Sequence, residues 1–150
     1  MTSVLFVCLG NICRSPMAEG LFKKYVQEQK LPIKIDSAAT SHWEIGNPPY
    51  PGTQAIFKRE GISFDEMASR QIADEDFRLF DYIIGMDHNN VTELKRRAPI
   101  ELHDKIHLYM DVVPGKEGWI VPDPWPDGDF DETFELLSEG LPYWMERFIN

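Results

Sequence analysis

A short apolar run near the N-terminus leads directly into a tight loop that is followed by a helix-like pattern. Residues 3–8 are largely apolar and partly β-branched, which predicts a strand buried in a sheet. Ser15 suits the N-cap of a helix and Pro16 suits its first position, so a helix should begin here and continue to about residue 29. Cys8 should therefore lie where the strand ends, and the fold must accommodate this strand–loop–helix unit.

Strand-like and helix-like segments alternate along the rest of the chain, which predicts an α/β fold. We expect three layers, with a four-stranded parallel sheet covered by helices on both faces. The expected strands are residues 3–8, 33–39, 82–86 and 105–110, and the expected helices are residues 15–29, 53–60, 74–80, 89–97 and 131–148. Thr53, Asp74 and Asn89 or Asn90 are the expected N-caps. A chain of 150 residues is typical of one domain, so residues 1–150 are assigned to a single domain.

The loop after the first strand has the composition of an oxyanion-binding site. The N–H groups at a helix N-terminus are unpaired and carry partial positive charge, and Gly10 relieves steric limits in the loop above them. Arg14 adds a planar fork of donors that can bind two oxygens at once. Cys8 lies in the same positive field, which favours the thiolate, and a thiolate beneath a tetrahedral oxyanion can attack its central atom. Ser15 could donate a hydrogen bond to that thiolate when it leaves.

The same loop has other interpretations. In a purely structural one, Cys8 is an ordinary buried cysteine and Arg14 is a surface charge. A cation beside a helix N-terminus is electrostatically unfavourable, which weakens that interpretation. The loop lacks the G-K-[ST] sequence of a nucleotide-binding P-loop. Cys8 and Cys13 are too few for a disulfide framework, and C-x4-C without a second pair is a poor zinc signature.

Residues 112–129 form a long segment rich in proline, glycine and aspartate, and loops of this length in compact domains are usually functional or disordered. Asp123, flanked by prolines on both sides, is the candidate general acid that protonates a leaving group. The alternative is an ordinary Asp-Pro turn. Trp43 and Trp125 lie in loops at the same expected edge and could wall a slot for a flat ring, although either could pack in the core.

The net charge of −10 is concentrated in one part of the chain. Residues 111–150 contain ten acidic and two basic residues, so this region alone carries −8. Such a surface repels nucleic acids and anionic membranes, and an anionic substrate must be attracted locally, inside the loop. No apolar run approaches the ~20 residues that span a bilayer, and the N-terminus has no signal-peptide pattern. We expect a cytoplasmic protein without nucleic-acid or membrane partners.

Several motifs resemble those of the low-molecular-weight protein tyrosine phosphatases, in the same order along nearly the whole chain. The most specific is the run from Cys8 to Pro16, C-L-G-N-I-C-R-S-P, and the Asp123-Pro124 pair near the C-terminus also matches. Supporting matches lie at residues 36–37, 40–43, 69–72, 80–83 and 86–87. The resemblance implies a four-stranded parallel sheet with a phosphate-binding loop after its first strand, and it implies protein tyrosine phosphatase activity.

The resemblance also implies a role for each site residue, in a two-step hydrolysis that uses no metal and no other cofactor. Cys8 attacks phosphorus and becomes a phosphocysteine, while Arg14 and the loop amides hold the phosphate oxygens. Asp123 protonates the phenolate and then activates water, and Trp43 and Trp125 flank the phosphotyrosine ring. The residues that bind phosphate or order the loop are Leu9, Gly10, Asn11, Ile12, Cys13, Ser15 and Ser37, with Ser37 the partner of Asn11.

Further expectations come from the same resemblance. Cys13 can form a reversible disulfide with the nucleophile Cys8, which makes it a possible redox partner. The expected partners are tyrosine-phosphorylated proteins and inorganic phosphate or similar oxyanions, and the expected assembly is a monomer or weak dimer. The sequence also departs from the family pattern: Trp125-Pro126 stands where many members have two tyrosines, Met67 replaces a common histidine, and residues 48–53 resemble a form found in some bacterial members.

Three related activities compete with this interpretation. Protein-arginine phosphatases resemble this loop but typically carry threonine at the position of Ile12, so the larger Ile12 favours a phenolic substrate. Arsenate reductases of similar fold relay a disulfide through further cysteines, and this chain has none beyond Cys13. A non-catalytic oxyanion-binding module would keep the loop but would have no use for both Cys8 and Asp123.

Overall fold

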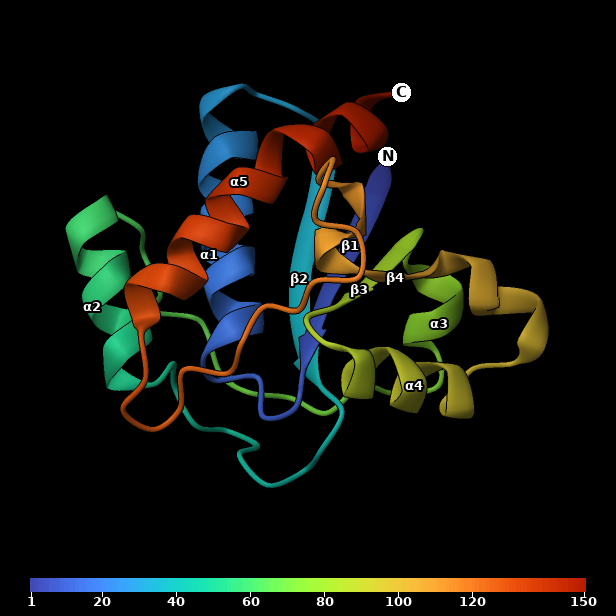
Figure 1. Ribbon diagram of the computed structural model, residues 1–150, viewed down its shortest axis with the longest axis horizontal. Helices are drawn as coiled ribbons and strands as arrows, with labels where there is room; N and C mark the ends of the chain where they lie inside the picture. Colours follow the sequence, from blue (N-terminus) through green and yellow to red (C-terminus); the bar gives the residue numbers. More distant parts are fainter.

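A four-stranded parallel sheet forms the middle layer of the molecule in the computed structural model, which describes residues 1–150 (Figure 1). The strand order is β2-β1-β3-β4. The strands are β1 (Thr2–Cys8), β2 (Ile33–Ala39), β3 (Tyr82–Gly85) and β4 (Ile106–Leu108). The helices are α1 (Arg14–Glu28), α2 (Pro51–Glu60), α3 (Asp76–Leu79), α4 (His88–Arg97) and α5 (Phe130–Ile149), with two 3₁₀ segments, η1 (Ile100–Lys105) and η2 (Tyr109–Val112).

Helices cover both faces of the sheet, with α1, α2 and α5 on one side and α3 and α4 on the other (Figure 1). Successive side chains of β1 point to opposite faces, because side chains alternate along a strand. Phe6 and Cys8 belong to the larger apolar core beneath α1, α2 and α5, whereas Leu5 and Val7 belong to the smaller core beneath α3 and α4. Both sets are buried, which explains the continuous apolar run in the sequence. The predicted three-layer α/β fold is confirmed.

In the strand order β2-β1-β3-β4, the chain adds β2 on one side of β1 and then β3 and β4 on the other side. The end of β1 therefore lies at the topological switch point of the sheet. β1 pairs with β2 on one side, where Cys8 lies opposite Ala39, and with β3 on the other, where Val7 lies opposite Gly85. The connections from neighbouring strands diverge at such a point, and ligands of open α/β sheets bind in the crevice outside the carboxyl ends of the strands. The loop that follows Cys8 occupies this crevice.

Helix α1 begins at Arg14, with Cys13 as its N-cap residue. The prediction that Ser15 caps this helix is wrong. Ser15 lies within the first turn, and its hydroxyl is 3.0 Å from Cys8 Sγ. No side chain caps α1, so the N–H groups of its first turn keep their capacity to bind a ligand.

Helix α2 begins at Pro51, earlier than predicted, with Tyr50 at its N-cap position. The prediction that Thr53 caps this helix is wrong, because Thr53 is buried within the helix and its hydroxyl donates to Cys13 O at 3.2 Å. Proline is favoured at the first helical position because its ring fixes a suitable φ and its missing N–H costs nothing there. The contact from Thr53 fixes α2 against the loop after β1.

The predicted caps of α3 and α4 are also wrong. Glu75 is the N-cap residue of α3, without a side-chain hydrogen bond. Asp87 caps α4, since its carboxylate accepts from the N–H of Asn90 at 2.8 Å and the Asn90 side chain accepts from the N–H of Asp87 at 3.1 Å. This reciprocal capping box lies directly after β3 and fixes the carboxylate of Asp87 at the edge of the sheet that carries the loop.

The long segment between η2 and α5 crosses the carboxyl ends of the strands (Figure 1). It is attached to β3 by a hydrogen bond from the N–H of Val121 to the carbonyl of Met86, at 2.9 Å. It ends at Asp129, whose carboxylate accepts from the N–H of Glu132 and caps α5. None of the helices combines the length and the apolar character that crossing a bilayer requires.

His107 in β4 predicts a pH dependence of stability. Its ring packs against Tyr82 and Trp144, at centroid distances of 5.7 and 5.6 Å. Burial, reinforced by the positive charge of Arg147, lowers the pKa of His107 below its ordinary value of 6.5, although Asp111 and Asp104 oppose the shift. The unfolded chain therefore binds this proton more readily, and the free energy of unfolding falls as the pH drops below about 6.5.

The test is urea unfolding of the wild type and of His107→Gln at pH values of about 7.5 and about 5.5. We expect the free energy of unfolding to fall less for His107→Gln than for the wild type between these pH values. Equal losses in the two proteins would contradict the role assigned to the imidazole.

Candidate active site

A cavity of about 240 Å³ opens at the carboxyl end of β1. Its lining combines two cysteines, a guanidinium, two carboxylates and two indole rings. Its lining consists of Cys8, Leu9, Gly10, Ile12, Cys13, Arg14, Trp43, Glu44, Asp123 and Trp125. The fold thus brings the loop after β1, the β2–α2 connection and the loop before α5 to one place, although they are far apart in the sequence.

The sulfur of Cys8 is buried and surrounded by hydrogen-bond donors. The N–H of Asn11 donates to Cys8 Sγ at 3.3 Å, and the hydroxyl of Ser15 lies 3.0 Å from the same atom. Cys8 ends β1, so the rigid sheet holds its sulfur beneath the loop. Such a setting suits a thiolate, because each of these groups can donate a hydrogen bond to negative sulfur.

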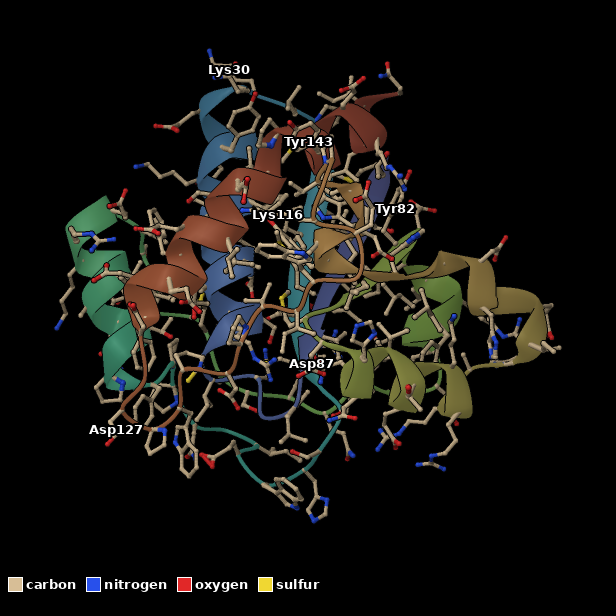
Figure 2. The ribbon with its side chains drawn as sticks, in the orientation of Figure 1. Lys30, Tyr82, Asp87, Lys116, Asp127 and Tyr143 are labelled. Atoms are coloured by element: carbon tan, nitrogen blue, oxygen red, sulfur yellow. The ribbon has the colours of Figure 1, made fainter.

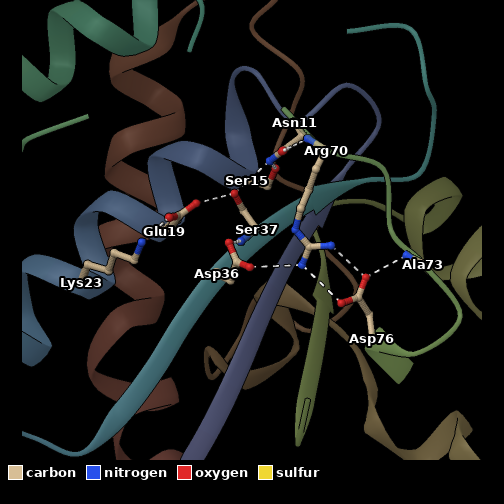
Figure 3. A network of polar contacts seen from close by, with 9 residues as sticks. All are labelled: Asn11, Ser15, Glu19, Lys23, Asp36, Ser37, Arg70, Ala73 and Asp76. Atoms are coloured by element: carbon tan, nitrogen blue, oxygen red, sulfur yellow. Dashed lines mark hydrogen bonds and ion pairs between the residues drawn. The ribbon is translucent and has the colours of Figure 1, made fainter. Parts of the chain in front are cut away.

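Asn11 gives the loop its shape. Its φ of 57° lies in the left-handed region, which asparagine tolerates better than most residues with a Cβ. Gly10, predicted to relieve steric limits in this loop, has no positive φ, and a Cβ built there would make only ordinary contacts within the protein. The Asn11 carbonyl oxygen accepts from the N–H of Arg70 at 3.1 Å, which ties the loop to the segment beside β2 (Figure 3).

A chain of hydrogen bonds leads from this loop to the surface (Figure 3). The Asn11 amide donates to Ser15 Oγ at 2.8 Å and to Ser37 Oγ at 2.9 Å. Ser37 Oγ donates in turn to a carboxylate oxygen of Glu19 at 2.5 Å, and Lys23 pairs with the other oxygen at 2.5 Å. Both hydroxyls thus accept from the amide of Asn11.

The contact from Asn11 leaves the proton of the Ser15 hydroxyl available for Cys8. Ser15 Oγ already accepts from the Asn11 amide, so its own proton is free to point at Cys8 Sγ. A hydroxyl that donates to sulfur stabilises the thiolate relative to the thiol. Ser15, misassigned as a helix cap, therefore has a chemical environment that fits support of a nucleophile.

The guanidinium of Arg14 is 2% exposed and extends across the base of the cavity. Its Nη1 donates to Asp87 Oδ2 at 2.7 Å and to the carbonyl of Val121 at 3.0 Å. Burial by itself would lower the pKa of Arg14, but the negative charges of Cys8, Asp87 and Asp123 outweigh it, so the pKa lies above its ordinary value. Arg14 is thus a permanent cation whose orientation is held by groups on two other segments.

One donor of this guanidinium is both buried and unpaired: Nε of Arg14 has no hydrogen-bond partner in the protein. Buried polar groups in native proteins are nearly always paired, and a buried donor on a charged group is costly to leave unsatisfied. The cavity beside it is where an acceptor must sit. A ligand with oxygen atoms in a planar or tetrahedral arrangement fits this need.

Asp87 belongs to this group of residues, although its sequence position after an apolar run fits an ordinary turn equally well. It follows β3 at the start of α4, where Figure 2 labels it. One carboxylate oxygen caps α4 and the other accepts from Arg14. Its position directly after a buried strand was the available signal, but only the fold shows that it faces an arginine 73 residues away.

Cys13 differs from Cys8 in its environment, although both are free thiols. Burial, followed by the nearby charges of Cys8 and Asp123, raises the pKa of Cys13 to about 12. Cys13 is therefore protonated at neutral pH and is not the nucleophile. It lies in the cavity wall beside Arg14, where the side chains of α2 and the loop meet.

Asp123 and the two tryptophans lie at the mouth of the cavity. Asp123 Oδ1 accepts from the N–H of Trp125 at 3.1 Å, and Asp123 Oδ2 lies 3.8 Å from Arg14 Nη2. Its side chain is half-exposed, so it can exchange protons with water. Trp43 is 68% exposed and Trp125 is 55% exposed, so neither packs in the core. Both line the cavity and are available to contact a bound ring.

Comparisons with known proteins agree over nearly the whole chain. Residues 3–149 match the family model described as low molecular weight phosphotyrosine protein phosphatase. The low molecular weight protein-tyrosine-phosphatase YfkJ of Bacillus subtilis is 48% identical over 93% of this chain and 91% of its own. The human low molecular weight phosphotyrosine protein phosphatase is 46% identical over 97% of this chain and 94% of its own.

Solved structures extend the comparison to three dimensions. The crystal structure of B. subtilis YfkJ has a TM-score of 0.93 and 46% identity, and the match covers 98% of this chain and 94% of that chain. The crystal structure of a Drosophila arginine phosphatase has a TM-score of 0.89 and 32% identity, and the match covers 100% of this chain and 99% of that chain. The same scaffold therefore occurs in proteins named for two different phosphorylated side chains.

Proposed function

Because the chain belongs to the low molecular weight phosphotyrosine protein phosphatase family, and is a protein tyrosine phosphatase, we propose that Cys8, Arg14 and Asp123 carry its catalysis. In this proposal Cys8 is the nucleophile, Arg14 binds the phosphoryl group and Asp123 is the general acid and then the general base. The Trp43 and Trp125 rings flank the phenyl ring of phosphotyrosine.

The observation that carries the proposal is the unpaired Nε of Arg14 beside a cysteine sulfur. A phosphate dianion above Cys8 would supply oxygens for Nε and for the adjacent Nη2, as bidentate pairs between arginine and phosphate do. Its other oxygens would face the N–H groups of the loop and of the first turn of α1, which no side chain caps. The binding site thus matches a tetrahedral anion in both charge and geometry.

In the first step, Cys8 Sγ attacks phosphorus, a sulfur–phosphorus bond forms and the bond from phosphorus to the phenolic oxygen breaks. Asp123 in its protonated form gives its proton to that oxygen, so tyrosine leaves as a neutral phenol. Arg14 stabilises the charge on the equatorial oxygens during this transfer, because its position is already held by Asp87 and Val121.

In the second step, the Asp123 carboxylate accepts a proton from water while the water oxygen attacks phosphorus. The sulfur–phosphorus bond breaks, inorganic phosphate is released and Cys8 leaves as a thiolate. Ser15 supports this departure, because its free proton points to the sulfur on which the negative charge develops. Asn11, Ser37 and Glu19 keep the Ser15 hydroxyl in that orientation.

A phosphorylated protein-arginine substrate is the second candidate, favoured by the likeness to the Drosophila arginine phosphatase. Ile12 lines the cavity, where a protein-arginine phosphatase typically has threonine. An apolar side chain there offers no hydrogen bond to a guanidinium, and burying a guanidinium without a partner is costly. The tryptophans and Ile12 together favour the phenyl ring, with phosphoarginine as the alternative.

We expect phosphotyrosine peptides to be hydrolysed faster than phosphoarginine or phosphoserine peptides of the same sequence. The difference in kcat/KM should be at least about tenfold, because an apolar, aromatic-walled slot discriminates most strongly against a polar group that it cannot pair. Phosphate release from the three peptides, measured side by side, checks this result. Faster turnover of phosphoarginine would overturn the assignment based on Ile12, and binding of phosphate without turnover would favour a non-catalytic oxyanion-binding module.

The setting of this activity forms part of the proposal. Phosphoproteins are the substrates that the family implies. We propose that inorganic phosphate and similar oxyanions compete for the same loop, that the protein acts in the cytoplasm and that it is a monomer or weak dimer. Because the net charge of the protein is −10, an anionic substrate gains no long-range electrostatic attraction to its surface. The substrate is attracted only close to the loop, where the local field is positive.

A further inference from the structure

Three aromatic rings form a line that starts at the mouth of the cavity and leads away from it. The Tyr50 ring meets the Trp125 ring edge-on, with centroids 6.5 Å apart and an interplanar angle of 66°. The Phe130 ring also contacts Tyr50 and stacks on it, with centroids 6.0 Å apart and an interplanar angle of 8°. The three rings come from the connection between β2 and α2, from the loop that carries Asp123, and from the start of α5.

Trp125 packs against this line through the ring of Tyr50. It is more than half exposed, and Tyr50 is the aromatic ring that contacts it. The backbone of Trp125 is coupled to Asp123, because its N–H donates to Asp123 Oδ1 at 3.1 Å. The residue that carries the indole thus also holds the carboxylate of the candidate general acid.

Tyr50 itself is firmly anchored. Its N–H donates to the carbonyl of Ile12, in the phosphate-binding loop, at 2.8 Å, and its carbonyl accepts from the N–H of Gln54 at 2.9 Å. Pro49 and Pro51 on either side restrict its backbone further. The backbone of Tyr50 is thus fixed against the loop after β1, while its ring packs against Trp125 and Phe130.

Phe130 is held in turn by a close contact with Gly52, in the first turn of α2. A Cβ built on Gly52 would lie 2.6 Å from three atoms of the Phe130 ring, closer than real Cβ contacts allow. Gly52 has no positive φ, so its backbone conformation is available to any residue. Glycine is required here because the ring approaches the helix backbone.

We propose that Tyr50 is a positioning residue that holds Trp125 as a wall for the phenyl ring and, through the Trp125–Asp123 turn, orients the general acid. The inference rests on the proposed function and goes beyond it, since Tyr50 does not line the cavity and touches no substrate. The order of support is Gly52, Phe130, Tyr50, Trp125, Asp123. Aromatic selectivity thus depends on a residue outside the site.

The first test compares Tyr50→Ala with Tyr50→Phe. We expect Tyr50→Ala to raise the KM for phosphotyrosine about three- to tenfold, the range that corresponds to loss of one aromatic pair, and Tyr50→Phe to behave like the wild type because the ring is retained. The inhibition constant of inorganic phosphate should stay unchanged in both variants, since phosphate binds to the loop and does not reach Trp125. Unchanged KM in Tyr50→Ala, or an equal rise in the phosphate constant, would overturn the proposal.

The link to Asp123 has its own readout. Phenyl phosphate has a poor leaving group that needs a proton, whereas p-nitrophenyl phosphate has a good one that needs it less. Tyr50→Ala should therefore lower kcat/KM more for phenyl phosphate than for p-nitrophenyl phosphate, a difference that mere loss of stability does not produce. Equal losses for the two substrates would contradict the coupling to the acid.

Gly52→Ala tests the same line without altering any of its rings. Alanine favours a helix over glycine by about fivefold in the equilibrium constant, so helix propensity should not lower the thermal midpoint of this variant. The new Cβ, however, must push Phe130 aside. We expect KM for phosphotyrosine to rise in Gly52→Ala. In a protein that already carries Phe130→Ala, adding Gly52→Ala should raise KM no further. If the effects of Gly52→Ala and Phe130→Ala on KM add up in the double variant, or if KM is unchanged in Gly52→Ala, the proposed order of support is overturned.

Tyr143→Ala is the matched control, because Tyr143 is a partly exposed aromatic residue on α5, toward the opposite end of the molecule from Asp87 (Figure 2). It should leave both KM and the phosphate inhibition constant unchanged. Failure of the proposed function is recognised separately: in that case the wild type itself does not hydrolyse aryl phosphates. If the wild type is active and Tyr50→Ala matches it in every readout, only the positioning role of Tyr50 is refuted.

Discussion

Replacing Cys8 with serine is expected to reduce phosphotyrosine hydrolysis by about 10⁴-fold or more, the scale seen when a nucleophile is removed from a catalytic site. The serine hydroxyl is a far weaker nucleophile than a thiolate that accepts from Asn11 and Ser15, and none of the neighbouring side chains can supply a substitute nucleophile. Binding of inorganic phosphate should survive, because Arg14 and the loop N–H groups remain in place. Steady-state kinetics and equilibrium phosphate binding measure the two effects independently.

The matched control for this variant is Cys13→Ser. Cys13 has a pKa of about 12 and is therefore a thiol at neutral pH, so its replacement should retain most of the activity. Iodoacetate should label Cys8 and leave Cys13 unmodified, and inorganic phosphate should protect Cys8 from the reagent. Intact-mass measurement after rapid quenching should detect one phosphoryl group on the wild type and none on Cys8→Ser. Full turnover by Cys8→Ser would refute the covalent mechanism.

Asp123→Ala is expected to produce the second-largest effect, a fall in kcat for phenyl phosphate of about 10²- to 10⁴-fold, as is typical of the loss of a general acid. The phenolate then leaves without a proton, and the attacking water has no base in the second step. KM should change much less, since Asp123 lies at the mouth of the cavity and is not among the donors that hold phosphate. The effect should be smaller for p-nitrophenyl phosphate, whose leaving group is stable as an anion.

Asp127→Ala is the control for Asp123→Ala. Asp127 belongs to the same loop and carries the same charge, but it does not line the cavity (Figure 2 labels it). Its removal should leave kcat nearly unchanged, which separates proton transfer from a general effect of negative charge. A phenyl phosphate rate that is unaffected in Asp123→Ala would remove Asp123 from the mechanism.

The loop after β1 shows how much of a site can be predicted from local sequence. Cys8, Arg14 and Ser15 lie within one short connection between a buried strand and a helix, so their proximity follows from the backbone geometry of a single unit. The loop chemistry and its resemblance to a phosphatase loop predicted an oxyanion site, and the family that the resemblance named is the one whose model matches residues 3–149. Asp123 was predicted as an acid for its chemistry. Its distance of 3.8 Å to Arg14 could not be predicted, because the two residues lie on different segments of the chain.

Other residues required the tertiary structure because their sequence patterns had simpler explanations. Ser15 has the features of a helix cap, but the sulfur of Cys8 competes for its hydroxyl, and α1 begins one residue earlier. Asp87 resembles a turn residue until β3 places it beside Arg14. Tyr50 lies in a proline-rich connection without periodicity, and only the packing of three separate segments gives its ring a role.

The sequence by itself determined the α/β class and the strand–loop–helix unit that carries Cys8 and Arg14, because these depend on residues that are neighbours along the chain and on the apolar pattern of buried strands. The tertiary structure alone decided which distant groups complete the loop. Arg14 meets the carbonyl of Val121 across 107 residues only because the parallel sheet aligns the carboxyl ends of β1 and β3, and Val121 is bonded to the end of β3. Contacts of this kind arise from strand register and side-chain packing, which no local spacing encodes.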